Sequence, residues 1–355
     1  MSGEAVGGEQ SLGDGLSLAR HVTVVVVAWG SMPLLRQCIT AILESRTVTT
    51  DVVVVDNGCT DGSVDDLPKD DRVQVLRPGS NLGFAGGCNL GAGAASGDVV
   101  AFINPDAVVD ASALCALATA LDDREIGIAT ARLRLLDQPD LLNSSGGSLH
   151  FLGLGWANGF GVPAASECDQ RPVTNASGAS MAMRTELFRR VGGFTPELFL
   201  YHEDCELSLR IWLLGFRVEL IPGADVWHDY HFARNSEKYY FLERNRLIIV
   251  ASIYERRTLL LLAPALGFLE LGLFVLAALQ GWFPEKVRGW RWLIAHRKWL
   301  VEHRRRIQGE RIVRDRDLVP LLSARFDAGQ LSLPASAKPV DWLLSQYWRV
   351  VLHGL

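Results

Sequence analysis

The sequence lacks the features that define several common protein classes. Its six cysteines form no C-x-x-C pair, so neither a zinc site nor a redox pair is indicated, and reduced, buried, cytoplasmic thiols are expected. The formal net charge of −5 provides no basic excess of the kind that nucleic-acid binding requires. No internal repeat of solenoid period is present. We therefore expect no nucleic-acid partner and no repeat architecture.

The first residues also lack a targeting pattern. Residues 1–20 are rich in glycine and acidic side chains, without the basic and apolar segments of a signal peptide. This composition predicts a disordered tail. Across the 355 residues, hydrophobic side chains make up 48% and charged side chains 21%, which is enough for a sizeable core in one large domain or two smaller ones.

Apolar and helical segments alternate through the first third of the chain. Continuous apolar runs predict buried strands at Val22–Ala28, Val52–Val55, Val73–Leu76 and Val99–Ile103. Helical spacing predicts helices at Leu34–Leu43, Phe84–Ala95, Ser112–Leu121 and Glu203–Leu214. Strands that alternate with helices indicate a parallel sheet built from βαβ units. The alternation loosens over residues 143–172, which are rich in Gly, Ser and Asn.

Polar side chains stand where three of these strands end. They are Trp29, Asp56, Asn57, Asn104 and Asp106. Two glycine-rich loops, residues 56–63 and 81–89, join them, and glycine allows close approach of backbone to a ligand. Since the carboxyl ends of parallel strands share one edge of a sheet, we expect these groups to converge on one ligand. Neither loop has the pattern of a dinucleotide or P-loop site, which disfavours both classes.

Two acidic motifs each allow a structural and a functional interpretation. In "AFINPDAVVD", an apolar strand runs into Asn104-Pro105-Asp106, which is either a turn or a metal- or phosphate-facing carboxylate at a strand tip. In "LYHEDCELSLR", acidic residues crowd a helix start, which the helix dipole alone favours. The later "VWHDYHF" adds two imidazoles, His228 and His231.

Together these segments resemble the family 2 glycosyltransferases, most closely the bacterial rhamnosyltransferase-like enzymes of cell-wall and O-antigen polysaccharide assembly. The matching segments are Val52–Ser63, Asn81–Asn89, Asn104–Asp106, Ser177–Arg210 and Lys238–Leu247. The resemblance covers about residues 20–255, which we take as a catalytic domain over 21–255. It implies an α/β, A-type glycosyltransferase fold with a Rossmann-like, mostly parallel sheet.

The resemblance also implies roles for individual residues. Asp106 and His228 would hold Mg²⁺ or Mn²⁺, with Asn104 in place of the first carboxylate of the family's Asp-x-Asp motif. Asp204 would be the general base, with Glu203 as its rival, while His202 is expected to point to solvent. The donor nucleotide would be bordered by Trp29, Asp56 (on the base), Asn57, Asn81, Gly83, Phe84 and Asn89.

The implied reaction is inverting transfer of one sugar from a nucleoside-diphosphate sugar, dTDP-rhamnose or a UDP-sugar. The acceptor would be a hydroxyl of a polyprenyl-diphosphate-linked saccharide in cell-envelope synthesis. The Q-x-x-R-W motif of processive synthases is absent, which indicates one sugar per encounter. Two alternatives are a sugar nucleotidyltransferase, although "AWGSMPLL" after the first strand lacks the basic loop it would need, and a non-catalytic scaffold that binds nucleotide sugars.

The last hundred residues depart from this pattern. Thr258–Phe283 is long enough for a membrane span and has Glu270 as its only charge, but Pro264, Gly267 and Gly272 interrupt it. A basic, Trp-rich segment over 286–306 follows, and positive-inside bias opposes its export. We therefore predict a helical, membrane-associated region over 256–355, in or on the cytoplasmic face of a bacterial inner membrane. The alternative is buried core followed by a solvated basic helix.

Overall fold

A computed structural model describes residues 20–230, 236–326 and 338–355 of the chain. The predicted tail, apart from Arg20, and His231 lie outside the described residues. The main sheet has ten strands, eight of them in the order β10-β12-β6-β11-β4-β1-β2-β3, with β5 and β7 off this path. Their bounds are β1 His21–Gly30, β2 Thr49–Cys59, β3 Val73–Leu76, β4 Val99–Ile103, β5 Ala107–Val109, β6 Ile126–Leu135, β7 Leu142–Ser144, β10 Arg171–Pro172, β11 Ser180–Arg184 and β12 Arg217–His228.

The four strands expected from the sequence, β1 to β4, form one half of this sheet, and they pair in parallel with one another. β1 pairs in parallel with both β2 and β4, and β2 with β3. Side chains alternate between the two faces of β1, so Val24 and Val26 enter one core and Val25 and Val27 the other. Both faces of β1, β2 and β4 are buried over their apolar runs, which explains why these three strands are continuously apolar in sequence, whereas edge strand β3 is only partly buried. The parallel βαβ prediction is confirmed for this part of the chain.

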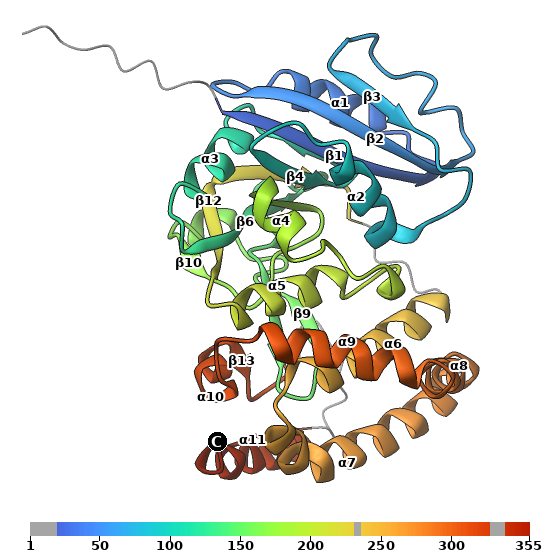
Figure 1. The fold of residues 1–355 in the computed structure, drawn as a ribbon, viewed down its shortest axis with the longest axis vertical. Helices are drawn as coiled ribbons and strands as arrows, with labels where there is room; N and C mark the ends of the chain where they lie inside the picture. The colour runs from blue at the N-terminus through green and yellow to red at the C-terminus, as the bar shows by residue number, and fades with distance from the viewer. Residues whose placement is uncertain (1–19, 231–235, 327–337) are drawn as a thin grey trace, which may run out of the picture.

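Helices cover each face of the sheet and make a three-layered domain (Figure 1). The first face carries α1 (Leu35–Leu43) and α3 (Ala113–Ala120). The second carries α2 (Gly83–Gly93), α4 (Thr185–Arg190) and α5 (Glu203–Leu213). Pro33 and Leu34 form a turn, and α1 begins one residue later than expected.

The second half of the sheet is mixed. β11 runs antiparallel between β4 and β6, whereas β12 is parallel to β6 and antiparallel to β5 and β10. Residues 143–172 contribute β8 (Gly147–His150) and β9 (Gly155–Ala157) to a separate three-stranded sheet, whose third strand is β13 (Leu322–Ser323). Pairing of β13 with β8 joins this segment to the C-terminal part of the chain.

The C-terminal region is helical, as expected, and stacks at the end of the molecule away from β1–β3 (Figure 1). Its longer helices are α6 Ser236–Ile253, α7 Arg256–Gln280, α8 Phe283–Ala295, α9 Arg297–Glu310 and α11 Lys338–His353, with short α10 Asp315–Leu318 between them. α6, within the expected catalytic domain, packs against α8 and α9. The expected interruption of the apolar segment is wrong, because α7 is continuous through Pro264, Gly267 and Gly272, all of which are exposed.

α7 is fastened to its neighbours by a buried ionic cluster. Glu270 pairs with Arg246 of α6 and, at 3.0 Å, with Lys286 of α8. Glu243 of α6 lies 3.2 Å from Arg246 and 2.5 Å from Lys286. Two cations thus meet two anions across three helices, and Trp290 donates a further hydrogen bond to Glu270 at 3.1 Å. α7 has the length and composition of a membrane span, yet these bonds hold it along the domain.

The same contacts correct part of the membrane prediction. Lys286 is fully buried in the ionic cluster and unavailable to lipid. Arg304 donates to the backbone carbonyls of Ala251 and Tyr254 at the end of α6. These two basic side chains serve the fold because partners from α6 reach them. The exposed cations of the segment are Arg288, Arg291, Arg297, Lys298, Arg305 and Arg306.

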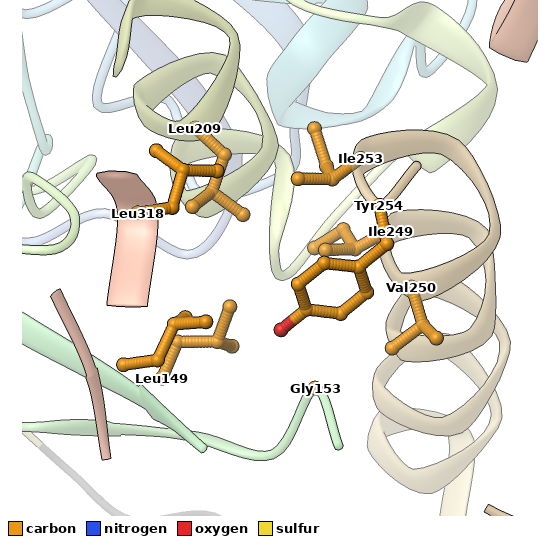
Figure 2. Close-up of a pocket in the computed structure, with 9 residues that line it drawn as sticks. Leu149, Gly153, Leu209, Ile249, Val250, Ile253, Tyr254 and Leu318 are labelled. Atoms are coloured by element: carbon orange, nitrogen blue, oxygen red, sulfur yellow. The ribbon is translucent and has the colours of Figure 1, made fainter. Parts of the chain in front are cut away.

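A small cavity lies where α5, α6 and the three-stranded sheet meet (Figure 2). Its volume of about 10 Å³ is roughly that of one water, and its lining is apolar apart from Tyr254. The Tyr254 hydroxyl donates to the carbonyl of Phe151 at 3.0 Å. This cavity is a packing defect and has no room for a sugar nucleotide.

Candidate active site

The carboxyl ends of β1 and β2 meet at one edge of the sheet. Trp29, at the end of β1, is 58% exposed, and its ring lies beside Gly58 of β2. Asp56 accepts hydrogen bonds from the backbone of Gly58 and Cys59, at 3.2 and 3.0 Å. These bonds fix the end of β2, and the exposed Trp29 indole lies beside it as a flat surface.

Arg77 is a site residue that the sequence interpretation missed. Its Nε donates to Asp56 at 3.2 Å and its Nη2 to Asp65 at 2.7 Å. It stands directly after β3, so the rule that strand tips carry the site applies to it as well. Arg77 adds a cation beside the carboxylate that was expected to contact the nucleotide base.

Asn57 and Asn81 together build the start of α2. The Asn57 amide donates to Asn81 at 2.9 Å and accepts from the Leu82 N–H at 2.8 Å, while Asn81 accepts from the Gly83 N–H at 2.8 Å. Gly83 has φ +69°, and a Cβ there would lie 2.4 Å from the Phe199 carbonyl oxygen. Only glycine fits at this position, because the backbone before α5 passes so close.

Asn89 departs from its expected place beside the nucleotide. Its amide nitrogen donates to the Phe194 carbonyl at 2.8 Å, and its oxygen accepts from the Phe194 N–H at 2.9 Å. Both ends of the side chain are therefore occupied in holding a distant loop against α2. The geometry gives Asn89 a structural contact and none with the strand-tip edge.

Asp106 and His228 come together although 122 residues separate them. β12 ends at His228, which pairs in register with Ala107 next to Asp106. Nε2 of His228 lies 3.2 Å from Oδ1 of Asp106 and 3.3 Å from the amide of Asn104. Nδ1 lies 3.0 Å from Oδ1 of Asn143, so it carries the ring hydrogen and Nε2 presents its lone pair.

This pair has the donor set of a divalent-cation site. The buried Oδ1 of Asp106 accepts no hydrogen bond from any described residue, and a second acceptor, Nε2, faces it. One carboxylate and one imidazole suit Mg²⁺ or Mn²⁺, whose other ligands would be diphosphate and water oxygens. Within the described ranges no group of three or more His, Cys, Asp or Glu side chains is placed to hold a metal. The residues present thus fit a cation that the substrate helps to bind.

The two carboxylates at the start of α5 differ in environment. Oδ2 of Asp204 accepts from the Gly178 N–H at 2.9 Å and Oδ1 from the Cys205 N–H at 2.7 Å. Burial raises the pKa of Asp204, and these bonds limit the rise. Burial and then the charge of Asp204 raise the pKa of Glu203 well above its ordinary value, and its buried Oε2 has no hydrogen-bond partner among the described residues. Burial therefore opposes the charged form of both carboxylates, and the backbone N–H groups offset part of this effect at Asp204.

Contacts connect the carboxylate to the strand tips. A Cβ on Gly178 would lie 3.2 Å from the Phe84 ring and 3.5 Å from Asp204, so these two side chains flank Gly178. The next residue, Ala179, accepts a hydrogen bond from the Asn104 N–H at 3.1 Å. The expected donor, metal and base groups, Asn89 excepted, thus occupy one continuous edge.

The expectation that His202 points to solvent is wrong. Its ring lies near Gly155 of β9, and burial, with the nearby charge of Arg246 second, lowers the pKa of His202 to about 4. His202 therefore stays neutral at physiological pH. It also has a left-handed backbone, as do Phe199 and Tyr201 just before it.

Comparisons with known proteins agree with this arrangement. A sequence model described as "Glycosyltransferase like family 2" matches residues 19–248. The N-acetylglucosaminyl-diphospho-decaprenol L-rhamnosyltransferase of Mycobacterium tuberculosis is 27% identical over 234 residues, 58% of this chain and 75% of that protein. Rhamnosyltransferase WbbL of Escherichia coli is 32% identical over 80 residues, 22% of this chain and 29% of that protein.

A solved structure shows the same fold. The structure of GalNAc-T7 with UDP, GalNAc and Mn²⁺ aligns with a TM-score of 0.57 and 16% identity, over 70% of this chain and 51% of that one. The present chain thus spans about half of that chain, and a likeness at this identity concerns the fold alone. With the family match over most of the first 250 residues, the chain belongs to glycosyltransferase family 2 and is a glycosyltransferase with the A-type fold.

Proposed function

We propose that this enzyme transfers one sugar, with inversion, from dTDP-rhamnose or a UDP-sugar to a hydroxyl of a polyprenyl-diphosphate-linked saccharide. The observation that carries the proposal is the single edge that joins Asp204 to the Asp106–His228 pair. One base on the acceptor side and one charge-stabilising site on the leaving-group side match single displacement. The likeness to an enzyme named for a decaprenol-linked acceptor and L-rhamnose supports these substrates.

Asp204 would take the proton from the acceptor hydroxyl as its oxygen attacks the anomeric carbon. Backbone N–H groups hold both carboxylate oxygens, which fixes the direction of the carboxylate. A pKa raised by burial makes Asp204 a stronger base than a solvated aspartate, while it still ionises more readily than Glu203. Glu203, whose pKa burial raises well above its ordinary value, would line the acceptor side without taking the proton.

Asp106 and His228 would hold the divalent cation, Mg²⁺ or Mn²⁺, against the donor diphosphate. When bound, this ion offsets the negative charge that develops on the departing nucleoside diphosphate. Asn143 keeps the lone pair of His228 Nε2 directed at the site, and Asn104 lies beside it with an amide where a second carboxylate would add charge. The donor base would lie near Trp29, Asp56 and Arg77, and the sugar near Phe84.

The enzyme would work at an anionic membrane surface through a face that we call the apolar face. It consists of exposed side chains along one side of α7 and on neighbouring α11: Leu260, Phe268, Leu271, Val275, Leu279, Trp342, Leu343 and Val350. The two helices share a core cluster and lie together at the far end of the molecule (Figure 1). Of the most apolar 18-residue window of α7, only 17% is buried.

Charge favours lipid as the occupant of this face. Residues 256–306 hold ten Lys and Arg but three Glu, a formal charge of +7 on a chain whose total is −5. Exposed Arg256 and Arg257 stand at the start of α7, and Arg349 lies on α11 beside Val350. Apolar side chains flanked by cations match the interface of an anionic leaflet. The ionic cluster around Glu270 would keep α7 in the plane of this surface.

A donor screen by mass spectrometry tests the proposed function. The full chain is incubated with Mn²⁺, a polyprenyl-diphosphate-linked N-acetylglucosamine acceptor and each nucleotide sugar in turn. The expected product carries one additional sugar, rhamnose or the sugar of a UDP donor. Donor binding without turnover would favour a scaffold, and formation of a nucleotide sugar from a nucleoside triphosphate and a sugar phosphate would favour a nucleotidyltransferase. Either result would overturn the proposal.

A further inference from the structure

Two neighbouring residues of α6, Arg244 and Asn245, hold the backbone that leads into the proposed base. We propose that they form a clamp that positions the segment Glu197–His202, and through it Asp204, over the donor loop. The inference rests on the proposed role of Asp204 and goes beyond it, because neither clamp residue is placed to touch a substrate. Both are buried and belong to the "KYYFLERNRL" segment, to which the proposed reaction gives no part.

The clamped segment has a backbone that needs external support. Phe199, Tyr201 and His202 have φ values of 64°, 64° and 67°, in the left-handed region that side chains with a Cβ disfavour. Three such residues within four positions persist only where surrounding contacts determine them. The segment leads directly into Glu203, where α5 begins, so its backbone conformation determines the direction of the Asp204 side chain.

Asn245 supplies the central contacts of the clamp. Its amide nitrogen lies 2.9 Å from the carbonyl oxygen of Leu198, 3.0 Å from that of Leu200 and 2.6 Å from that of Tyr201. The side chain of Asn245 is completely buried. One amide thus gathers three carbonyls that the turn directs to the same point.

Arg244 extends the clamp and supports it from behind. Its Nη2 donates to the carbonyls of Glu197 and Leu198 at 2.7 and 2.9 Å, and its Nε donates to Asn245 Oδ1 at 2.9 Å. The last bond sets the Asn245 amide with its N–H groups toward the segment. The guanidinium also lies 4.6 Å from the ring centre of Trp292 on α8, so a C-terminal helix supports the clamp.

The held segment touches the donor side of the site as well. The Phe199 carbonyl accepts a hydrogen bond from the Ala85 N–H of α2 at 3.2 Å, beside the Gly83 backbone. The Phe199 ring stacks on Phe241 of α6 at 5.3 Å. One short segment therefore joins the start of α2 to the start of α5, and the clamp sets the distance between donor loop and base.

The test compares Asn245→Ala and Asn245→Asp with Gln308→Ala. Gln308 is a matched control, because its amide also donates to two carbonyls of α6, those of Ser252 and Ile253, at the end away from the site. We expect each Asn245 variant to lower kcat about tenfold or more, with the donor Kd, measured by calorimetry with Mn²⁺, within about twofold of wild type. Gln308→Ala should keep kcat per folded molecule.

A pH profile separates positioning from mere folding. Displacing the segment exposes Asp204, so the acidic limb of kcat should move to lower pH in the Asn245 variants. Loss of folded protein alone would lower the amplitude and leave the limb in place, and this result would overturn the proposal. Equal loss of kcat in Gln308→Ala would do the same.

Two further variants keep the test decisive. If the Asn245 variants fail to fold, Arg244→Lys retains the charge but loses the paired contacts, and the same profile and donor affinity are measured on it. Asp204→Asn runs in parallel. Its full activity would overturn the base assignment, whereas unchanged kcat and an unchanged acidic limb in the clamp variants would overturn the clamp.

Discussion

Two clusters of ionisable side chains in this molecule are built in opposite ways. In the cluster around Glu270, two cations meet two anions, and the charges cancel inside the protein. At the sheet edge, Asp106 faces the lone pair of His228, and Glu203 stands next to Asp204, with no Lys or Arg paired to these carboxylates among the described residues. The first cluster is complete without a ligand and holds helices together. The second is incomplete, and a cation, a diphosphate and a hydroxyl would complete it.

Removal of Asp106 should give the largest effect on activity. Asp106→Ala removes the carboxylate that faces His228, and we expect transfer to fall below detection in a radiolabelled-sugar assay with Mn²⁺. Excess chelator should have the same effect on the wild type. Asp65→Ala, which alters an exposed partner of Arg77, serves as the control and should stay active. Wild-type turnover in Asp106→Ala would place the charge stabilisation elsewhere.

The next largest effect should distinguish the two carboxylates at the start of α5, Asp204 and Glu203. Asp204→Asn keeps the size and removes the proton acceptor, so turnover should fall by about 10²-fold or more while donor affinity is retained. Burial already opposes the charged form of Glu203 and raises its pKa, so Glu203→Gln should cost far less. Single-turnover kinetics measure both variants. If Glu203→Gln lost its activity and Asp204→Asn kept it, Glu203 would be the general base instead of Asp204.

The pH dependence sharpens the same contrast. The base must be ionised, and burial raises the pKa of Asp204, so activity should decline as the pH falls through this raised value. The decline should therefore begin at a higher pH than a solvated aspartate would give. A kcat profile of the wild type measures it. An acidic limb at the ordinary value for Asp would mean that the base is solvated.

Substitutions in the ionic cluster around Glu270 should lower stability and leave the transfer reaction unchanged. Glu270→Gln leaves Arg246 and Lys286 with one anion, which we expect to lower the free energy of unfolding by about 3 kcal/mol. Glu237→Gln breaks an exposed ion pair with Arg288 and should change the free energy of unfolding by about 1 kcal/mol at most. Thermal unfolding compares the two. Equal, small shifts would show that the cluster does not fasten α7.

The smallest effects should come from the apolar face of α7 and α11 and from the exposed arginines of α9. Changing Leu271 and Leu279 to Gln should weaken sedimentation with both neutral and anionic liposomes, because apolar burial is lost. Changing Arg305 and Arg306 to Gln should weaken it for anionic lipid alone and more at low salt, by about 1 kcal/mol for each charge. Leu90→Gln on α2 is the control. A wild-type chain that stays in solution with every lipid would disprove membrane docking.

The sequence predicted features that depend on local patterns and missed those that depend on contacts between distant residues. The strand tips at Asp56 and Asp106 were predictable because Asp56 directly follows an apolar run and Asp106 stands three residues after another. Parallel strands bring such positions to one edge of the sheet. Asn89 was misplaced because its partner, Phe194, lies 105 residues away. Lys286 and Arg304 looked available to lipid because their partners Glu243 and Tyr254 lie 43 and 50 residues away in the sequence. Antiparallel β11 was missed because a buried central strand has no orientation signal in its residues.

One titration tests the central claim, that the incomplete cluster is the substrate site, most directly. Calorimetry measures the affinity for a nucleoside diphosphate with and without Mn²⁺ in the wild type, Asp106→Ala and Glu270→Gln. We predict that Mn²⁺ strengthens binding at least tenfold in the wild type and in Glu270→Gln, and that Asp106→Ala loses this gain. The same Mn²⁺ dependence in Asp106→Ala as in the wild type would contradict the account.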